Sequence, residues 1–393
     1  MPAAQPDPAA LLSGAGTIDL VDGGSAQPYL PAGTAGTASE DAARNQDERI
    51  ALLLPLSGNL AHLGRSMLNA AQLALFDAAD DTFELMILDT EGEPHRASEA
   101  ARAAIEQGAK LIIGPLLAES TRAAAPWAQA AGVPILSFSS DRTVAGNGVF
   151  VLGFTPSEQV DRVIQYASGR GFAEFAVIAP QNAYGDLVVQ AVQEAVRRGG
   201  GRLTDIQFAG TDPSGVTSAV QALTTHPSWA SASPGDTGRA LLIAEGGDRL
   251  RSIASQLEAS GVAPGGVQLL GTGTWDEPWI SGESALIGGW FAAPSPWSRS
   301  RFVQNYTQTY GETPPRLAGL AYDATALAAI VGRIVGPENL NADVLATPAG
   351  FIGSEGIFRF ASSGVAERGL AVLEVAPQGV NVISDAPQSF VGI

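Results

Sequence analysis

From Arg49 onward, short apolar runs alternate with amphipathic stretches, and this repetition constrains the fold more than any other feature of the chain. Runs such as IALLLP (50–55) and KLIIG (110–114) have the length and composition of buried strands, whereas 60–79 carries apolar residues at helical spacing. Strand–helix repetition predicts a parallel sheet with helices on both faces. Because a second series of the same kind runs over 172–273, we expect an α/β protein with two doubly wound, Rossmann-like lobes.

Two further helices, expected over 297–310 and 317–335, follow the second series, and the end of the chain alternates apolar and polar residues like antiparallel strands. Adding those helices to the first lobe requires three crossovers of the chain between the lobes. Ligands of such sheets bind beyond the carboxyl ends of the strands, so we expect a ligand cleft between the lobes. The expected limits are 49–153 plus 293–350 for lobe 1, and 154–292 plus 351–393 for lobe 2.

The first 48 residues are rich in Ala, Gly, Pro, Ser and Asp and contain few large apolar residues. Such a segment buries too little apolar surface to fold alone, so we expect 1–48 to be a disordered, low-complexity tail. Apolar runs along the rest of the chain are interrupted by Arg, Asp, Gly or Pro before they reach the ~20 residues that span a bilayer.

The composition argues against several classes of function. The chain has 22 basic and 40 acidic residues and a formal net charge of −18, which argues against nucleic acid or an anionic membrane as its partner. It has no Cys, and its three His lie far apart, so we expect no thiol chemistry and no metal site. The Walker, G-x-S-x-G and H-E-x-x-H motifs are missing as well. We therefore expect a protein that is not an enzyme and that uses no cofactor.

Polar residues gather where the predicted strands end. The sequence FSSDRTVAGNG (138–148) follows the fourth strand, QNAYGD (181–186) follows a strand of the second series, and Pro-Leu-Ser-Gly follows the first. A helix that starts after such a loop offers backbone N–H groups to an anionic or polar ligand. Each loop also fits an ordinary turn, with Asp141 paired to Arg142 and Tyr184 covering a helix end. Their shared place at strand ends favours a ligand site. The candidates from these and two further strand ends are Ser139, Ser140, Asp141, Tyr184, Glu245 and Trp275.

Several of these stretches resemble the type I periplasmic binding proteins of the leucine/isoleucine/valine-binding family. They include PLSGNLAHLG, GAKLIIGPLLAESTRAAAPWAQAAGVPILSFSS, NAYGD and GIFRF, in that family's order, and the resemblance runs from about Arg49 to the C-terminus. It implies a cleft that closes on its ligand, lined by the loop after the first strand, the turn after the fourth and the Tyr-Gly turn of lobe 2. The cleft residues that it implies are Ser57, Leu63, Leu117, Ala118, Ser139, Ser140, Asp141, Tyr184, Glu245 and Trp275.

Two positions depart from the amino-acid-binding members of that family. Ala118 stands where they use a Ser to hold the ligand carboxylate, and Asp141 stands where they use a Thr. The aromatic and acidic groups that embrace the ligand ammonium fall near Gly247 and Gly273. A leucine-like ligand would lose charge-assisted hydrogen bonds worth roughly 1.5–3 kcal/mol each. We therefore expect free branched-chain amino acids to be poor ligands.

Other stretches, among them FSSDRTVAGNGVFVLGF and PPRLAGLAYDATALA, look closer to a divergent branch, the penicillin-binding protein activators. This resemblance implies a periplasmic protein that regulates peptidoglycan synthesis by contacting a penicillin-binding protein, with or without a small ligand in the cleft. It also implies a lipid anchor on a Cys ahead of the given sequence. The alternative is the solute-binding subunit of an ABC transporter for amino acids or related molecules, with a permease as its partner.

Overall fold

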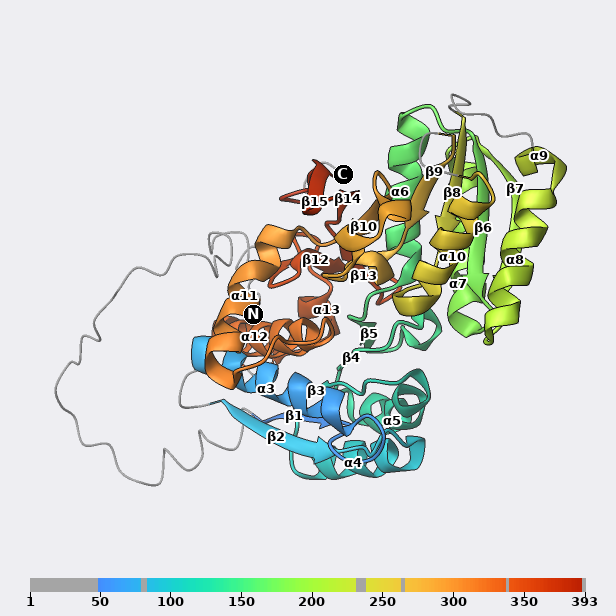
Figure 1. The fold of residues 1–393 in the computed structure, drawn as a ribbon. Coiled ribbons are helices and arrows are strands. Elements are labelled where there is room, and N and C mark those ends of the chain that lie inside the picture. The colour runs from blue at the N-terminus through green and yellow to red at the C-terminus, as the bar shows by residue number, and fades with distance from the viewer. Residues whose placement is uncertain (1–48, 79–82, 231–237, 263–265, 337–338, 391–393) are drawn as a thin grey trace, which may run out of the picture. The chain divides into compact units, whose positions relative to one another are not determined.

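The computed structural model describes residues 49–78, 83–230, 238–262, 266–336 and 339–390 (Figure 1). The predicted tail, 1–48, lies outside the described residues. The chain divides into two units, and each consists of separate stretches of sequence. Unit 1 holds the described residues up to Phe154, Pro296–Arg368 and those from Gln388 onward, and unit 2 holds Thr155–Ser295 and Gly369–Pro387.

Unit 1 is built on a parallel sheet of β1 (Arg49–Leu54), β2 (Glu84–Asp89), β3 (Leu111–Ile113), β4 (Ile135–Ser137) and β5 (Val149–Val151). The strand order is β2-β1-β3-β4-β5. Leu54 at the end of β1 pairs with Asp89 at the end of β2, and Ile50 pairs with Leu111 in β3. β1 and β3 are almost entirely buried, as unbroken apolar sequences require in a sheet that is covered on both faces.

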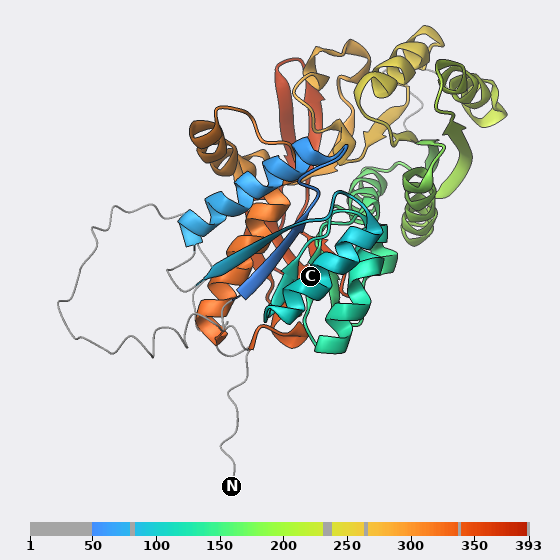
Figure 2. The ribbon, with the colours of Figure 1, turned by 90° about the horizontal axis from the view of Figure 1, so that it is seen from below.

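Helices cover both faces of this sheet. They are α3 (Ala61–Ala78) and α12 (Ala318–Val335) on one face, side by side in Figure 2, and α4 (Pro94–Glu106) and α5 (Ala118–Ala131) on the other. The alternation along β1 divides its side chains between two cores. Leu52 and Leu54 pack with α3 and α12, while Ala51 and Leu53 pack with α4 and α5. Unit 1 also contains α11 (Pro296–Tyr310), α13 (Ala342–Leu345) and the 3₁₀ turn η1 (Arg142–Val144).

Of the described helices, α12 is long and apolar enough to cross a membrane, with a mean hydropathy of 1.4 over 18 residues. In the structure 83% of that stretch is buried inside the protein, where its side chains join the core shared with α3. The apolar character of α12 is therefore that of a core helix.

A small antiparallel sheet corrects the expected limits of the lobes. It consists of β11 (Phe351–Gly353), β12 (Gly356–Phe360) and β13 (Ala366–Arg368). We expected everything from 351 onward in lobe 2, but this sheet belongs to unit 1, and the chain leaves the unit only after Arg368. The chain then returns to unit 1 at Gln388, after β15 (Gly379–Ser384).

Buried charges at the tip of the β11–β12 hairpin account for this placement. Asp323 of α12 accepts hydrogen bonds from the backbone amides of Ser354, at 2.5 Å, and Glu355, at 3.4 Å. The Glu355 side chain is fully buried, and its Oε1 lies 3.2 Å from Nε of Arg299 in α11. A buried carboxylate without a cation is costly. The hairpin tip therefore lies where Arg299 can pair with the Glu355 side chain and where Asp323 can accept hydrogen bonds from the backbone amides of the tip.

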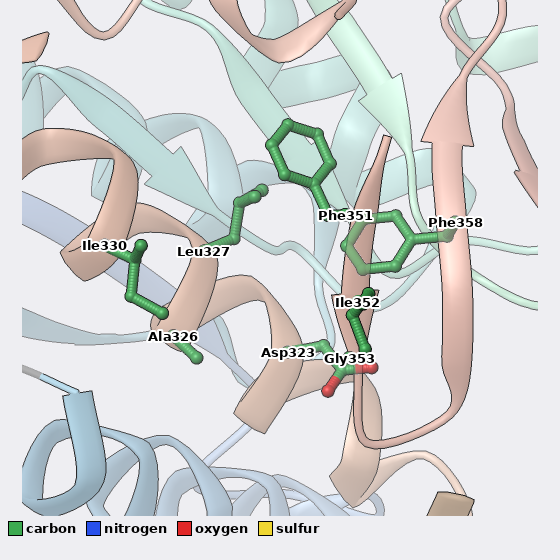
Figure 3. A pocket seen from close by; sticks show the side chains of 8 residues that line it. All are labelled: Asp323, Ala326, Leu327, Ile330, Phe351, Ile352, Gly353 and Phe358. Atoms are coloured by element: carbon green, nitrogen blue, oxygen red, sulfur yellow. The ribbon is translucent and has the colours of Figure 1, made fainter. Parts of the chain in front are cut away.

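Asp323 also lies at one end of a small cavity between α12 and the β11–β12 hairpin (Figure 3). The cavity has room for about one water molecule. Apart from Asp323 and Gly353, its lining is apolar: Ala326, Leu327, Ile330, Phe351, Ile352 and Phe358. Burial raises the pKa of Asp323 to about 6, although hydrogen bonds from Ser354 and the charge of Arg368 lower it.

This carboxyl should make the stability of the protein depend on pH. Between about pH 4 and 6 the folded chain keeps a proton on Asp323 that the unfolded chain releases, so this contribution to the free energy of unfolding is lost as pH rises. The difference between about 6 and the ordinary 3.8 corresponds to about 3 kcal/mol. Asp323→Asn keeps an acceptor oxygen but does not titrate. In urea unfolding from pH 4 to 7.5, the advantage of the wild type over Asp323→Asn should shrink with rising pH, and parallel curves would contradict this.

Unit 2 is built on a seven-stranded sheet with the order β15-β14-β10-β9-β8-β6-β7. Its other strands are β6 (Glu174–Pro180), β7 (Arg202–Ala209), β8 (Arg239–Ile243), β9 (Gln268–Gly271), β10 (Trp290–Ala293) and β14 (Ala371–Ala376). The strands from β6 to β10 pair in parallel, and β14 and β15 add an antiparallel edge.

The sheet of unit 2 is also covered on both faces. The helices are α6 (Pro156–Gly169) and α7 (Ala183–Arg198) on one face, and α8 (Pro213–Thr225) and α10 (Gly247–Ala259) on the other. Shorter elements are α9 (Pro227–Ala230) and the 3₁₀ turns η2 (Gly273–Trp275), η3 (Ile280–Gly282) and η4 (Ser284–Leu286). The expected fold class, an α/β protein with two doubly wound sheets, is confirmed.

Candidate functional site

The loop between β1 and α3 already holds a carboxylate of the protein. Oδ1 of Asp89, at the end of β2, accepts hydrogen bonds from the amides of Leu56 at 2.8 Å, Ser57 at 3.3 Å and Glu91 at 2.8 Å. Burial raises the pKa of Asp89, but the hydrogen bonds from Ser57, Glu91 and Leu56 outweigh this and keep it below its ordinary value. Two amides of the loop in which we expected a ligand are thus occupied. The Ser57 side chain is exposed and Leu63 is half-buried against the core of unit 1.

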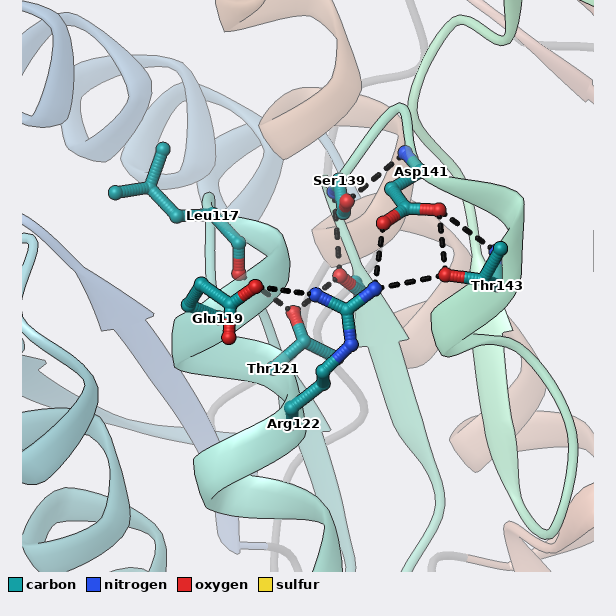
Figure 4. A network of polar contacts seen from close by, with 8 residues as sticks. Leu117, Glu119, Thr121, Arg122, Ser139, Asp141 and Thr143 are labelled. Carbon is teal, nitrogen blue, oxygen red and sulfur yellow. Dashed lines mark hydrogen bonds and ion pairs between the residues drawn. The ribbon is translucent and has the colours of Figure 1, made fainter. Parts of the chain in front are cut away.

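Past the end of β4, Arg122 and Asp141 form the centre of a polar network (Figure 4). Nη2 of Arg122 donates to Oδ2 of Asp141 at 2.6 Å and to Oγ1 of Thr143 at 2.7 Å, and Nη1 donates to Oε1 of Glu119 at 2.6 Å. Oδ1 of Asp141 accepts from the amide and the hydroxyl of Thr143, at 2.9 and 2.7 Å. Figure 4 shows the guanidinium between the two carboxylates. The charged and hydroxyl groups of Glu119, Arg122, Asp141 and Thr143 are therefore paired with one another.

Asp141 pairs with Arg122 and not with its neighbour Arg142, the partner that the alternative interpretation of this loop as an ordinary turn had given. Burial raises the pKa of Asp141, but the hydrogen bonds from Thr143 and the pairing with Arg122 outweigh it and lower the pKa below its ordinary value. Asp141 is therefore ionised and already neutralised by a cation. Glu119 leaves the group with one excess negative charge.

The remaining unit 1 candidates surround this network. The Ser139 side chain is buried and its Oγ accepts from the amide of Asp141 at 3.0 Å, whereas Ser140 is exposed. Ala118 is the first residue of α5 and offers no hydroxyl. Leu117, which is 37% exposed, points away from the network in Figure 4. Ser139 and Asp141 thus lie in the loop after β4, which the Arg122–Asp141 pair joins to α5. Ala118 and Leu117 lie at the start of α5.

In unit 2 the strand-end residues form a hydroxyl chain. Tyr184, in the first turn of α7, has its hydroxyl 3.0 Å from Oγ1 of Thr272, which lies 2.9 Å from Oγ1 of Thr274. Thr274 donates to the backbone carbonyl of Glu245 at 3.0 Å. Burial raises the pKa of Tyr184, so its phenol stays protonated near neutral pH and can donate to Thr272. These groups link the ends of β6, β8 and β9.

Glu245 is buried and its carboxylate is paired. Oε1 accepts from Nε and Nη2 of Arg249 at 3.0 and 2.8 Å, and Arg249 also donates to the carbonyls of Ala209 and Gly210. Glu245 is only 6% exposed. The pair therefore fastens the start of α10 to the end of β7, and the carboxylate has little surface to offer a ligand.

Trp275 corrects another expectation, because it is a core side chain. It is 0% exposed, its Nε1 donates to the backbone carbonyl of Ile243 at 3.1 Å, and its ring packs near Phe291. Gly271 and Gly289 lie directly against the ring, where an added Cβ would clash with it. The 3₁₀ turn η2 directs this indole under the end of the sheet. The side chain belongs to the core of unit 2 and has no exposed surface.

Sequence reasoning missed the arginines that pair with the candidate carboxylates. Arg122 neutralises Asp141, and Arg249 neutralises Glu245. Helical spacing gave a partial signal, since Glu119 and Arg122 stand three residues apart and Glu245 and Arg249 stand four apart. Among the described residues, no group of three His, Asp or Glu side chains could hold a metal ion.

Residues 48–379 match the model of the periplasmic binding protein family. The chain belongs to that family. Membership implies a location in the periplasm or cell envelope.

Two curated relatives are similar over part of the chain. The penicillin-binding protein activator LpoA of Vibrio cholerae is 28% identical over 153 residues, which is 38% of this chain and 25% of that protein. The uncharacterised protein RP748 of Rickettsia prowazekii is 25% identical over 177 residues, 45% of this chain and 47% of that protein. The chain thus spans between a quarter and about half of the length of these relatives.

Solved structures of ABC transporter binding proteins share the fold over most of the chain. The substrate-binding protein from Sphaerobacter thermophilus has a TM-score of 0.69 at 21% identity and covers 86% of this chain and 98% of its own. The leucine-binding protein LivK from Thermotoga maritima has a TM-score of 0.63 at 22% identity, with coverages of 86% and 98%. At such identities the likeness shows the fold.

Proposed function

We propose that this chain is a non-enzymatic envelope protein of the penicillin-binding protein activator type, which regulates peptidoglycan synthesis by contacting another protein. The observation that carries the proposal is the Arg122–Asp141 network, because it fills with the protein's own groups a turn that would hold a ligand carboxylate in an amino-acid binder. The partial sequence match to LpoA supports the same branch. In this proposal the family fold serves as a contact module.

The strand-end loops of unit 1 have little to offer a free amino acid. Ala118 lacks a hydroxyl, both oxygens of Asp141 already accept hydrogen bonds, and Asp89 uses the amides of Leu56 and Ser57. Each missing charge-assisted hydrogen bond costs a ligand roughly 1.5–3 kcal/mol. A ligand carboxylate would also meet the excess negative charge left by Glu119.

Calorimetric titration of the whole chain with leucine, isoleucine and valine should therefore show no binding at micromolar concentration. Two lost hydrogen bonds correspond to an affinity at least about a hundredfold below that of a micromolar binder. Asp141→Ala and Tyr184→Ala test the two candidate strand-end surfaces, and Arg142→Ala, an exposed neighbour outside the network, is the matched control. Micromolar leucine binding that survives Asp141→Ala and disappears with Tyr184→Ala would overturn the proposal.

The partner itself can be tested directly. The chain should bind a purified penicillin-binding protein from the same organism and raise its rate of peptidoglycan synthesis. That rate is measured by the incorporation of labelled lipid-linked precursor. Arg122→Ala should leave that stimulation unchanged, because in this proposal the network only fills its own turn. Absence of both binding and stimulation would refute an activating role.

The second candidate function is the solute-binding subunit of an ABC transporter for amino acids or related small molecules. It is favoured by the coverage of the structural matches, which reaches 88% of this chain, whereas the match to the Vibrio cholerae activator covers 38%. A micromolar ligand together with binding to a permease would favour this candidate.

A further inference from the structure

We propose that the segment 385–390 is a strap that restrains the movement of the two units relative to each other. The chain passes from one unit to the other after Phe154, Ser295, Arg368 and Pro387. Three crossovers are expected from the sequence, and the passage after Pro387 is a fourth. The residues that it returns to unit 1, of which 388–390 are described, add no helix or strand to that unit. What this last passage adds is a second point of attachment.

The strap is fastened to unit 2 at its first residues. Nη2 of Arg162, in α6, donates to Oγ of Ser384 at 2.7 Å and to the carbonyl of Asp385 at 3.3 Å. Nε of the same side chain donates to the carbonyl of Leu370 at 2.8 Å, which fixes the guanidinium beside β14. Ala386 is half-buried and packs against the core of unit 2. The chain is therefore held to unit 2 as far as Ala386.

An aromatic ring fastens the strap to unit 1. Phe390 is only 8% exposed, and the guanidinium of Arg359, in β12, lies 4.6 Å over its ring. Arg359 is itself held by Glu367 of β13, with 2.7 Å between Nε and Oε2. At Gly350 an added Cβ would lie 3.0 Å from the ring, so a glycine there leaves room for it. Burial and the cation over its face both hold the ring against the small sheet of unit 1.

The short span between the two attachments is what makes this segment a strap. Only Pro387, Gln388 and Ser389 separate Ala386 from Phe390. A fully extended chain advances by at most ~3.6 Å per residue, so the two attached residues can lie no more than about 14 Å apart. Pro387 also has a fixed φ, which removes some of the remaining freedom. A movement of the units that carries the attachments further apart must pull Phe390 out of its place.

This inference goes beyond the proposed function and does not depend on it. Restrained units suit a contact module, because less freedom of movement is lost when a partner binds. A solute-binding subunit could carry the same strap. The test therefore measures the movement itself and contains neither a penicillin-binding protein nor a ligand.

The chain has no Cys, so spin labels can be attached to cysteines introduced in each unit. Gln129→Cys on α5 and Gln193→Cys on α7 replace exposed side chains. Double electron–electron resonance on the whole chain then gives the distribution of distances between the labels, which we expect to be narrow. Inserting Gly-Ser-Gly-Ser-Gly-Ser between Pro387 and Gln388 keeps both attachments and lengthens the strap by up to about 20 Å. The distribution should then become roughly twice as broad.

A substitution tests the attachment in unit 1. Phe390→Ala should broaden the distribution as the insertion does, and it should speed amide hydrogen exchange in 386–390 at least about tenfold. Phe76→Ala is the matched control, because Phe76 is also a phenylalanine of unit 1 but is 84% exposed and far from the strap in sequence. It should leave the distances and the exchange unchanged. Circular dichroism checks that each variant is folded.

Several outcomes would overturn the inference. One is an unchanged distribution in the insertion variant, and another is a distribution without the insertion that is already as broad as with it. Broadening by Phe390→Ala but not by the insertion would show that the ring only stabilises unit 1. If the insertion broadens the distribution and no penicillin-binding protein is stimulated by the chain, the strap stands and the proposed function fails. If stimulation occurs and the insertion changes nothing, the proposed function stands and the strap fails.

Discussion

Replacing Arg299 by Met is expected to lower the free energy of unfolding by about 3–5 kcal/mol, because it removes the cation from a carboxylate that cannot reach water. The Glu355 side chain is 0% exposed, and Arg299, which lies 3.2 Å away, is the partner of its ion pair. Arg299 also donates to the carbonyl of Pro314 at 3.3 Å. Urea unfolding followed by circular dichroism measures the loss.

A double substitution separates the buried charge from simple loss of packing. Arg299→Met with Glu355→Met should recover most of the stability, since it replaces a buried ion pair by apolar groups. The control is Arg102→Met, which removes one side of an exposed pair with Glu106 and should cost less than about 1 kcal/mol. A loss for Arg299→Met no larger than the loss for Arg102→Met would show that Glu355 does not depend on its partner.

Trp275→Ala should destabilise the protein by about 3–5 kcal/mol, because the indole fills the core of unit 2. The substitution also leaves the backbone carbonyl of Ile243 without its donor. Trp275→Phe should cost less, since it keeps most of the ring. The measurement is again urea unfolding by circular dichroism, which does not rely on tryptophan fluorescence.

Trp297→Ala is the matched control for this core substitution. Trp297 is 81% exposed, so its removal should change the free energy of unfolding by less than about 0.5 kcal/mol. If Trp275→Ala instead kept full stability and abolished binding of a small ligand, the assignment of Trp275 to the core would be wrong and the original expectation would be restored.

Local sequence predicted the elements of unit 1 well where both faces are buried. The apolar run at 50–55 corresponds to β1, Arg49–Leu54, and the helical spacing over 60–79 corresponds to α3, Ala61–Ala78. Strands covered on both faces have unbroken apolar sequences, and helices that pack on one side have a periodic apolar face. Both signals are contained in the segment itself, so no tertiary information is needed to see them.

The place of the β11–β12 hairpin could not be predicted in this way. Its alternation correctly indicated antiparallel strands, but alternation does not say which sheet or unit a hairpin joins. That choice depends on Asp323 and Arg299, which meet the hairpin tip from positions far away in sequence. Contacts of this kind leave no periodic signal.

In the candidate site, too, the positions of the residues could be predicted from the sequence, but their partners could not. Asp141, Tyr184 and Glu245 do follow the ends of β4, β6 and β8, so their places could be predicted from the strand pattern. Their partners could not, because Arg122 lies 19 residues before Asp141 and Thr272 lies 88 residues after Tyr184. Whether these strand ends bind a ligand stays a prediction.

The shared core of α3 and α12 has a consequence for how this chain is made. During synthesis β1 and α3 leave the ribosome early, while α12, which covers the same face of the sheet, emerges only after the whole of Thr155–Ser295 has been made. Until then the core formed by Leu52, Leu54 and Met67 lacks the part that α12 contributes, so the nascent chain carries an exposed apolar surface for most of its synthesis. A chain of this topology completes neither unit before it is nearly full length, so both units acquire their finished cores only at the end of synthesis.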